Sequence, residues 1–201
     1  MIKKELNLYI ICILILISMV FLVLYVTNLK HFSSIEKPVQ NLLNEYFKIN
    51  HEHKSSDYSE IINNSNLIEM LTLNRQRFND SNKPKNKKYD IKINKIKKKR
   101  KNSYLVEFTL IEKRIIEKRT VNEESNYFSI IEKEDNKYYI NRIITSEDSG
   151  DIKKLRKVVE DEEAYNKYLN NLINSFRKQL LDKKMKSKSI LVSRVLNINL
   201  F

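Results

Sequence analysis

Glycine, proline and cysteine are almost absent from this chain of 201 residues, which has one glycine, two prolines and one cysteine. A glycine-rich phosphate-binding loop is excluded, because Gly150 stands alone. The single cysteine, Cys12, lies in an apolar N-terminal run, so the rest of the chain can form neither disulfides nor thiolate metal sites and has no cysteine nucleophile. So few turn-forming residues indicate long helices and strands.

Charge is missing from residues 8–27, a run of about 20 residues that is long enough to cross a bilayer as one helix. A cleaved secretory signal is the alternative, since two lysines precede the run. The run is longer than the apolar core of a signal, and no small-residue cleavage site follows it, because Ala164 is the only alanine. We therefore predict a retained transmembrane anchor at residues 6–29, after a cytoplasmic arm at residues 1–5.

The charges that flank this run are nearly balanced. Lys3 and Lys4 precede it, Lys30 and Lys37 follow it, and only short flanks count in the positive-inside rule. Long domains translocate largely regardless of their charge. We expect the short N-terminal arm to stay in the cytoplasm. This makes the chain a single-pass protein of the cell membrane with an extracytoplasmic C-terminal domain.

The soluble remainder of about 170 residues has the size of one domain with an accessory helix. The formal net charge of the chain is +13, but Lys, Asn and Ile are all abundant. An AT-rich genome would by itself produce much of this excess. The net charge therefore says little about the partner.

Two helical patterns open the soluble part. The first begins near Ser33 and Glu36, which have the spacing of a capping box, with Pro38 close behind. Its apolar face comprises Val39, Leu42, Leu43, Tyr46 and Phe47. After a polar stretch at 50–59, the second pattern comprises Leu67, Ile68, Leu71 and Phe78. We expect two amphipathic helices.

The period of the apolar residues then changes from that of a helix to two, the period of a strand. A first hairpin turns at 99–102, and the apolar positions of its strands are Tyr89, Ile91, Ile93, Tyr104, Val106, Phe108 and Leu110, continuing through Ile115 and Ile116. A second hairpin has strands at 127–132 and 138–144 and a polar turn at 134–137. Residues 33–149 are therefore expected to form an α+β domain, in which a curled four-stranded antiparallel sheet buries one face on the helices.

A long amphipathic helix is predicted over 151–185, within a segment at 150–186. Apolar residues recur there at near-heptad spacing: Ile152, Leu155, Val158, Tyr165, Leu169, Leu172, Phe176 and Leu180. Glu162 interrupts this stripe, which favours packing on the chain's own domain, with self-association as a coiled coil as the alternative. The last segment, 187–201, is an apolar tail without a polar cap and is interpreted as a possible truncation.

Few residues are candidates for chemistry. His51, Glu52 and His53 form the only local group that could bind a metal, and a solvated loop is the favoured interpretation. The acidic run at 160–163 points around a helix and is favoured as a solvated face, since it cannot form one acid and base pair. We expect no catalytic residue, no cofactor and no metal. A small enzyme remains a further alternative, with Tyr104, Tyr127 and His51 as its candidates.

The strongest charged feature is the stretch Lys83 to Lys101, in which Lys97, Lys98, Lys99, Arg100 and Lys101 crowd the first hairpin turn. Such a cluster attracts anions. If the domain lies outside the cell, these are wall polymers or lipid headgroups; inside, they are nucleic acid. The predicted orientation therefore makes nucleic acid an improbable partner. The alternative is that the lysines only protect the edge of the sheet.

Three segments carry a resemblance to a known family: LLNEYFK at 42–48, residues 66–75, and YYINRII at 138–144. Over residues 33–185 the chain resembles the region that precedes the catalytic module in putative cell-wall amidases of Gram-positive bacteria. The resemblance implies an anchor or signal, then a domain similar to the nuclear transport factor 2 fold (cystatin-like), then a long helix. The cysteine-dependent amidase module of that family has no counterpart here, so no catalytic residue is carried over.

The same order of elements also resembles the membrane-anchored scaffold subunits of conjugation machines, whose domains of this fold pack against copies of themselves. We predict a non-catalytic, membrane-anchored extracytoplasmic binding or scaffold protein. The first expectation is a relative of the non-catalytic region of the amidases, with a wall component or another protein as its partner. The alternative is a conjugation or secretion-system scaffold.

Overall fold

A computed structural model of the chain describes the backbone of residues 2–52, 57–77, 88–116, 119–148 and 151–198. Side chains are described for residues 13–23, 34–50, 57–77, 88–113, 121–147 and 151–183. The chain divides into two compact units, Met1–Val39 and Gln40–Phe201. The predicted metal candidates at 51–53 lie outside the described side chains, as does Phe78.

The first unit is helical, and its helix α1 runs from Ile2 to Glu52, into the second unit. The helix start predicted at Ser33 is therefore wrong. The residues before Ser33 are already helical, so no helix N-terminus lies there for a capping box to close. Pro38 lies inside the helix. In the first unit, all ten apolar side chains between Ile13 and Val23 are 46 to 68% exposed.

In the part of the chain whose side chains are described, no helical stretch has the length and apolarity that a membrane crossing requires. Of the predicted anchor, the side chains of residues 6–12 and 24–29 lie outside that part. The anchor stays a prediction.

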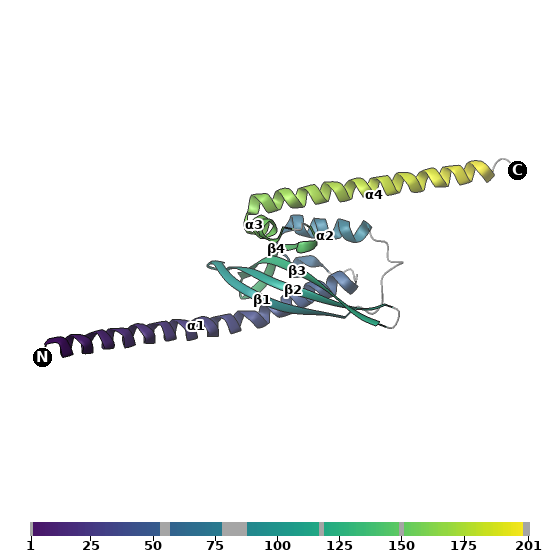
Figure 1. The fold of residues 1–201 in the computed structure, drawn as a ribbon. Helices are drawn as coiled ribbons and strands as arrows, with labels where there is room; N and C mark the ends of the chain where they lie inside the picture. The colour runs from purple at the N-terminus through teal and green to yellow at the C-terminus, as the bar shows by residue number, and fades with distance from the viewer. Residues whose placement is uncertain (1, 53–56, 78–87, 117–118, 149–150, 199–201) are drawn as a thin grey trace. The chain divides into compact units, whose positions relative to one another are not determined.

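The second unit is an α+β domain, as predicted (Figure 1). Its sheet is antiparallel with the strand order β1-β2-β3-β4, which confirms the four predicted strands. Along the chain its elements are η1 (Tyr58–Glu60), α2 (Ser65–Arg77), β1 (Lys88–Arg100), β2 (Ser103–Ile116), β3 (Arg119–Glu134), β4 (Lys137–Thr145), η3 (Ser146–Asp148), α3 (Ile152–Glu160) and α4 (Glu162–Ile198).

The turn between β3 and β4 lies where the sequence predicts it. Asp135 and Asn136 both have positive φ, 45° and 67°. Two successive residues in the left-handed region give the tight hairpin turn that matches the twist of the strands, and Asp and Asn tolerate this region better than most residues.

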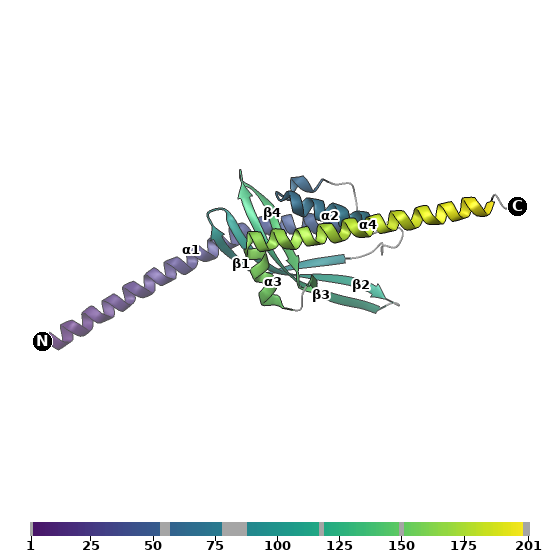
Figure 2. The ribbon, with the colours of Figure 1, turned by 90° about the horizontal axis from the view of Figure 1, so that it is seen from above.

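Both faces of the sheet contain buried residues, so the expectation of one buried face is wrong. Neighbouring residues of β2, Leu105 and Val106, are both fully buried, although their side chains point to opposite faces. On the face of Val106, the ring of Phe47 from α1 lies 6.0 Å from Phe108 and 5.3 Å from Tyr127. The other face is covered by α3, which contacts β3 and β4 (Figure 2).

Two helices, α3 and α4, replace the single helix predicted over 151–185. Asp161 between them is extended, with φ of −95° and ψ of 118°, and its carboxylate accepts the backbone N–H of Ala164 at 3.0 Å and so caps α4. Each helix buries residues four apart: Leu155 and Val159 in α3, then Tyr165, Leu169 and Ile173 in α4. The heptad interpretation is therefore wrong at Ile152, which is 50% exposed.

The inner face of α4 packs on the chain's own domain, against α2 and α3. This supports the intramolecular alternative as far as Ile173. The backbone of α4 continues to Ile198, whereas the side chains of the predicted apolar tail lie outside the described ones.

Candidate functional site

The most strongly charged element of the structure is β1, in which seven of thirteen residues are Lys or Arg and only Asp90 is acidic. These cations are Lys88, Lys92, Lys95, Lys97, Lys98, Lys99 and Arg100. We define the basic tip as Lys97, Lys98, Lys99, Arg100 and Lys101. All five residues are exposed at the end of the β1–β2 hairpin, as predicted. Their binding of anions stays a prediction.

The pairing of β1 with β2 separates apolar from charged side chains. Ile91, Ile93 and Ile96 stand opposite Leu110, Phe108 and Val106, which are buried, whereas Lys92, Lys95 and Lys97 stand opposite Thr109, Glu107 and Leu105 on the other face. The register shifts at Asn94 and again at Lys99. At the first shift, the amide of Asn94 donates to the hydroxyl of Thr109 at 2.9 Å. The strand therefore presents isoleucines on one face and lysines on the other.

One lysine of the basic tip has an acidic partner. Lys99 Nζ lies 2.7 Å from a carboxylate oxygen of Glu160, whose other oxygen accepts Arg156 Nε at 3.0 Å. The hydrogen bond from Lys99, aided by Arg156, lowers the pKa of Glu160. The guanidinium of Arg156 also pairs with Glu107 of β2 at 3.2 Å.

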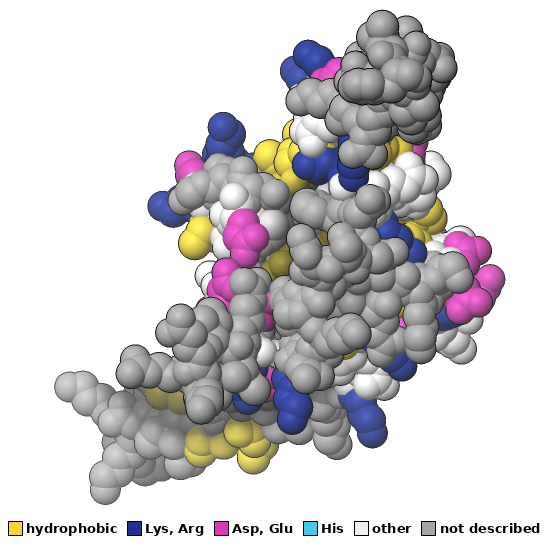
Figure 3. All heavy atoms as spheres, turned by 90° about the vertical axis from the view of Figure 1, so that its right-hand side faces the viewer, with side chains coloured by type: hydrophobic (Ala, Val, Ile, Leu, Met, Phe, Trp, Pro, Cys, Tyr) yellow, Lys and Arg dark blue, Asp and Glu magenta, His cyan; other side chains and the backbone are white. Residues whose placement is uncertain are grey.

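The other four cations of the basic tip have no acidic partner in the part of the chain that the structure describes. Among the described residues, Lys97, Lys98, Arg100 and Lys101 have neither an ion pair nor a side-chain hydrogen bond. Like charges this close repel one another, and an anion that binds between them relieves the repulsion. Among the coloured side chains of Figure 3, by contrast, Lys and Arg are scattered among acidic and uncharged residues.

Among the described residues, the outer edge of β1 is hydrogen-bonded at one residue, Ile91. At Ile91 the backbone N–H donates to the carboxylate of Asp90 at 2.9 Å, and the carbonyl accepts the amide of Gln40 at 2.9 Å. In an antiparallel ladder the N–H and C=O of one residue point to the same side, so both bonds lie on the outer edge. From Lys92 to Arg100, the described residues place no further hydrogen-bond partner on that edge.

The opposite edge of the sheet, β4, is closed by the chain itself. Ile140 N–H donates to Ile61 O at 2.8 Å, and Asn63 N–H donates to Ile140 O at 3.3 Å, which makes a short parallel bridge. Further along, the hydroxyl of Tyr165 donates to Ile143 O at 2.9 Å and accepts Ile143 N–H at 3.0 Å. The hydroxyl of Tyr165 thus bonds to both outward backbone groups of Ile143, its N–H and its C=O.

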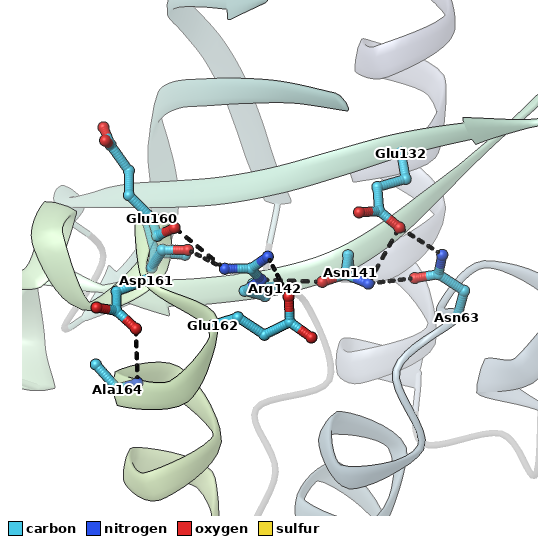
Figure 4. Close-up of polar contacts among 9 residues, drawn as sticks. Asn63, Glu132, Asn141, Arg142, Glu160, Asp161, Glu162 and Ala164 are labelled. Carbon is cyan, nitrogen blue, oxygen red and sulfur yellow. Dashed lines mark hydrogen bonds and ion pairs between the residues drawn. The ribbon is translucent and has the colours of Figure 1, made fainter. Parts of the chain in front are cut away.

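A buried arginine fixes the helices that close this edge (Figure 4). The side chain of Arg142 is 10% exposed, and its Nη1 donates to the carbonyls of Val159 at 3.2 Å and Glu160 at 3.3 Å. These carbonyls end α3 and would otherwise have no partner. The same guanidinium pairs with Glu162 at 3.5 Å and donates through Nε to Asn141 at 3.0 Å. Arg142 thereby holds the junction of α3 and α4.

The acidic run at 160–163 is not one solvated helix face. Glu160 ends α3, Asp161 caps α4, and Glu162 begins α4. Figure 4 shows the side chains of Glu160 and Glu162 pointing in different directions.

Aromatic rings fill the space between α1 and the sheet, where a domain of this shape could hold a ligand. Phe108 and Tyr127 stack at 5.1 Å, and Phe47 packs edge-on against both. Tyr46 is buried next to them, and burial raises the pKa of its hydroxyl. Tyr104, another predicted candidate, is also buried, with its ring 6.3 Å from that of Tyr138. The tyrosines are packing residues in this arrangement.

No group of three or more His, Cys, Asp and Glu side chains that could hold a metal occurs in the described part of the chain. A cavity of about 160 Å³ is lined by Arg77, Gln179, Leu180 and Lys183. Its Arg77 guanidinium lies 4.0 Å from the centre of the Phe176 ring. This shallow site has only two cations, fewer than the basic tip.

Two residues of the cationic strand, Lys92 and Lys95, lie within the charged stretch that the sequence indicates but outside the five predicted site residues. The signal for them was present, because Ile and Lys alternate in the sequence IKINKIK at 91–97.

No protein-family model, curated protein or solved structure matches this chain. The resemblance to amidase-associated regions therefore stays a prediction.

Proposed function

We propose that this chain is a single-pass, membrane-anchored protein whose extracytoplasmic α+β domain, without a catalytic role, binds an anionic partner. The observation that carries the proposal is the exposed apolar stretch from Ile13 to Val23, in which ten of eleven residues are apolar and each is 46 to 68% exposed. Successive residues of a helix are about 100° apart, so these side chains cover all its sides. A helix that is apolar all round is stable only in an apolar environment.

Two further observations support the membrane setting. The sequence around the exposed stretch stays uncharged from 8 to 27, which makes the apolar segment long enough for a bilayer. The polar atom within the described stretch, the hydroxyl of Ser18, donates to Ile15 O at 2.8 Å and needs no water.

The binding role is supported by the contrast between a filled interior and a charged edge. The rings of Phe47, Phe108 and Tyr127 occupy the interior, whereas four cations of the basic tip have no partner among the described residues. We include in the proposal that the domain is of the nuclear transport factor 2 (cystatin-like) type, because two helices precede its curled sheet. The likeness to the non-catalytic region of wall amidases favours an extracytoplasmic setting.

Carbonate washing of membranes tests the anchor. We expect the full chain to stay in the washed pellet, and the variant with Leu16→Lys and Val20→Lys to be released, since each lysine costs about 3 kcal/mol in the middle of a span. The matched control is Val121→Lys with Leu181→Lys, which alters two exposed apolar residues of the second unit and should remain in the pellet. A wild-type chain that washes off would overturn the anchor.

Reporters fused after Phe201 test the orientation. Alkaline phosphatase, which is active only outside the cytoplasm, should be active, and a cytoplasmic reporter at the same position should not. The reverse pattern would contradict the extracytoplasmic domain and make nucleic acid the better anionic partner.

A further inference from the structure

The two edges of the sheet are managed differently, and the difference indicates how a partner binds. The edge of β4 is occupied by the chain at Ile140 and Ile143. Among the described residues, the edge of β1 is bonded at Ile91, and the outward-facing N–H and C=O groups of alternate residues between Lys92 and Arg100 have no partner. Such a row is a template on which an extended segment can add a strand.

The side chains along β1 define what that segment must contain. Ile93 and Ile96 are half-buried, so they keep apolar surface at the edge of one face, whereas Lys92, Lys95 and Lys97 are exposed on the other face. Directly opposed residues of neighbouring strands lie within about 5.5 Å of each other. A segment that alternates acidic and apolar residues would set its acids beside the lysines and its apolar residues beside the isoleucines.

The same lysines act against other segments. Two copies of β1 placed edge to edge would bring cations of both chains into direct opposition, which is unfavourable in either strand direction. A neutral strand would remove water from the lysines and offer no charge in return. The lysines thus disfavour cationic and neutral strands at the edge of β1 but allow acidic ones. At the edge of β4, backbone and hydroxyl groups of the chain itself occupy the hydrogen-bonding positions.

We propose that the edge of β1 over residues 92–98 is a strand-addition site for an extended segment of a partner polypeptide with alternating acidic and apolar residues. The proposal rests on the proposed function, because it names the class of the anionic partner. A phosphate polymer could satisfy the lysines, but it has neither the backbone N–H and C=O groups to pair with β1 nor the apolar side chains to cover Ile93 and Ile96.

The test uses the full chain in detergent micelles and four peptides. The first is acetylated and amidated (Glu-Val)₅, and the second has the same composition with all glutamates before all valines. The third and fourth are the alternating peptide N-methylated at every valine or at every glutamate. Only alternate N–H groups of an added strand face its neighbour, so one methylated peptide should bind and the other should not. Electrostatic attachment alone would treat the two alike.

We expect the alternating peptide to bind about tenfold more tightly than the block peptide, a factor that one or two net hydrogen bonds supply. It should also slow hydrogen exchange of the β1 amides over 92–98. The variant with Lys92→Glu, Lys95→Glu and Lys97→Glu should lose this binding. The matched control changes three exposed lysines of the helices, Lys153→Glu, Lys157→Glu and Lys167→Glu, and should keep it.

The outcomes separate the two proposals. Equal binding of both methylated peptides, or binding without slowed exchange in β1, overturns strand addition and leaves an anionic partner in place. Strand addition is also overturned, and an anionic partner kept, if inorganic polyphosphate binds the chain as tightly as the alternating peptide. If neither the peptides nor polyphosphate bind, both proposals fail. The peptide comparison needs no variant of the protein, so a misfolded lysine variant does not weaken it.

Discussion

The two outer strands of the sheet, β4 and β1, each have backbone N–H and C=O groups that no neighbouring strand pairs, and the chain treats these groups differently at the two edges. The edge of β4 borders buried residues, among them Ile140, Ile143 and Ile144, and its outward groups are bonded to the Ile61–Asn63 segment and to Tyr165. The edge of β1 carries lysines that water can solvate. An apolar edge left open would aggregate, whereas a cationic edge stays soluble until an anion neutralises it. The difference indicates that the edge of β4 is part of the domain's structure and that the edge of β1 is available to a partner.

The structural edge depends on a long chain of polar contacts. Arg142 fixes the end of α3, the junction at Asp161 directs α4, and Tyr165 of α4 then reaches Ile143. Together these contacts connect the end of α3, the start of α4 and the edge of β4. We therefore expect the largest effects from changes at the start of this chain.

Arg142→Met should have the largest effect on stability. It removes a guanidinium that is 10% exposed and leaves the carbonyls of Val159 and Glu160 without a partner, so we expect a loss of about 3 kcal/mol in the free energy of unfolding. Urea unfolding of the full chain in detergent measures it. The matched control is Arg177→Met, whose pair with Glu69 is 56% and 40% exposed, and which should cost at most about 1 kcal/mol. Equal losses in the two variants would contradict the role given to Arg142.

Tyr165→Phe should have an intermediate effect. It removes the hydroxyl that both donates to and accepts from Ile143, and the ring remains to fill its buried position. We expect a loss of about 1.5 kcal/mol, together with faster hydrogen exchange of the Ile143 amide. Tyr139→Phe is the control, because Tyr139 lies on the same strand and its hydroxyl makes no hydrogen bond among the described residues. An unchanged exchange rate at Ile143 would mean that the edge is closed in some other way.

The sequence predicted the sheet better than the means by which its edges are closed. Alternation at Tyr104, Val106 and Phe108 placed β2, and the polar turn at 134–137 placed β4. Burial on both faces was also visible in the uninterrupted apolar residues 104–106, which the expectation of one buried face overlooked. Four antiparallel strands follow from local pattern because hairpins are local.

The junction at Asp161 shows where local pattern fails. Residues 152–180 contain neither Gly nor Pro and read as one helix, while the break depends on Arg142, which donates to carbonyls 17 and 18 residues away. A local signal existed: Asp161 followed by Glu162 and Glu163 is a typical helix start. The bonds of Tyr165 to Ile143 have no such signal, because a hydroxyl on a helix can bond to any backbone that packs near it.

Glu160→Gln should have the smallest effect on stability, and it tests the ion pair that connects α3 to the basic tip of β1. Glu160 belongs to α3 but binds Lys99 of the basic tip. The hydrogen bond from Lys99 lowers the pKa of Glu160 below the ordinary glutamate value of 4.5. The folded chain therefore holds this proton less tightly than the unfolded chain, and the stabilising contribution is complete above pH 4.5 and is lost as the pH falls through the lowered pKa.

In the Gln variant this pH-dependent contribution is absent, so the melting temperatures of variant and wild type should differ slightly at pH 7 and converge as the pH falls below 4.5. Thermal unfolding over this range measures the convergence, and Glu163→Gln, an exposed residue without an ion pair among the described residues, is the control.

The Glu160→Gln variant also frees Lys99, which gives the basic tip a fifth uncompensated cation. An acidic peptide should then bind about two- to fivefold more tightly at low salt. Unchanged affinity would mean that the contacts of the partner end before Lys99, within the lysines of β1 itself.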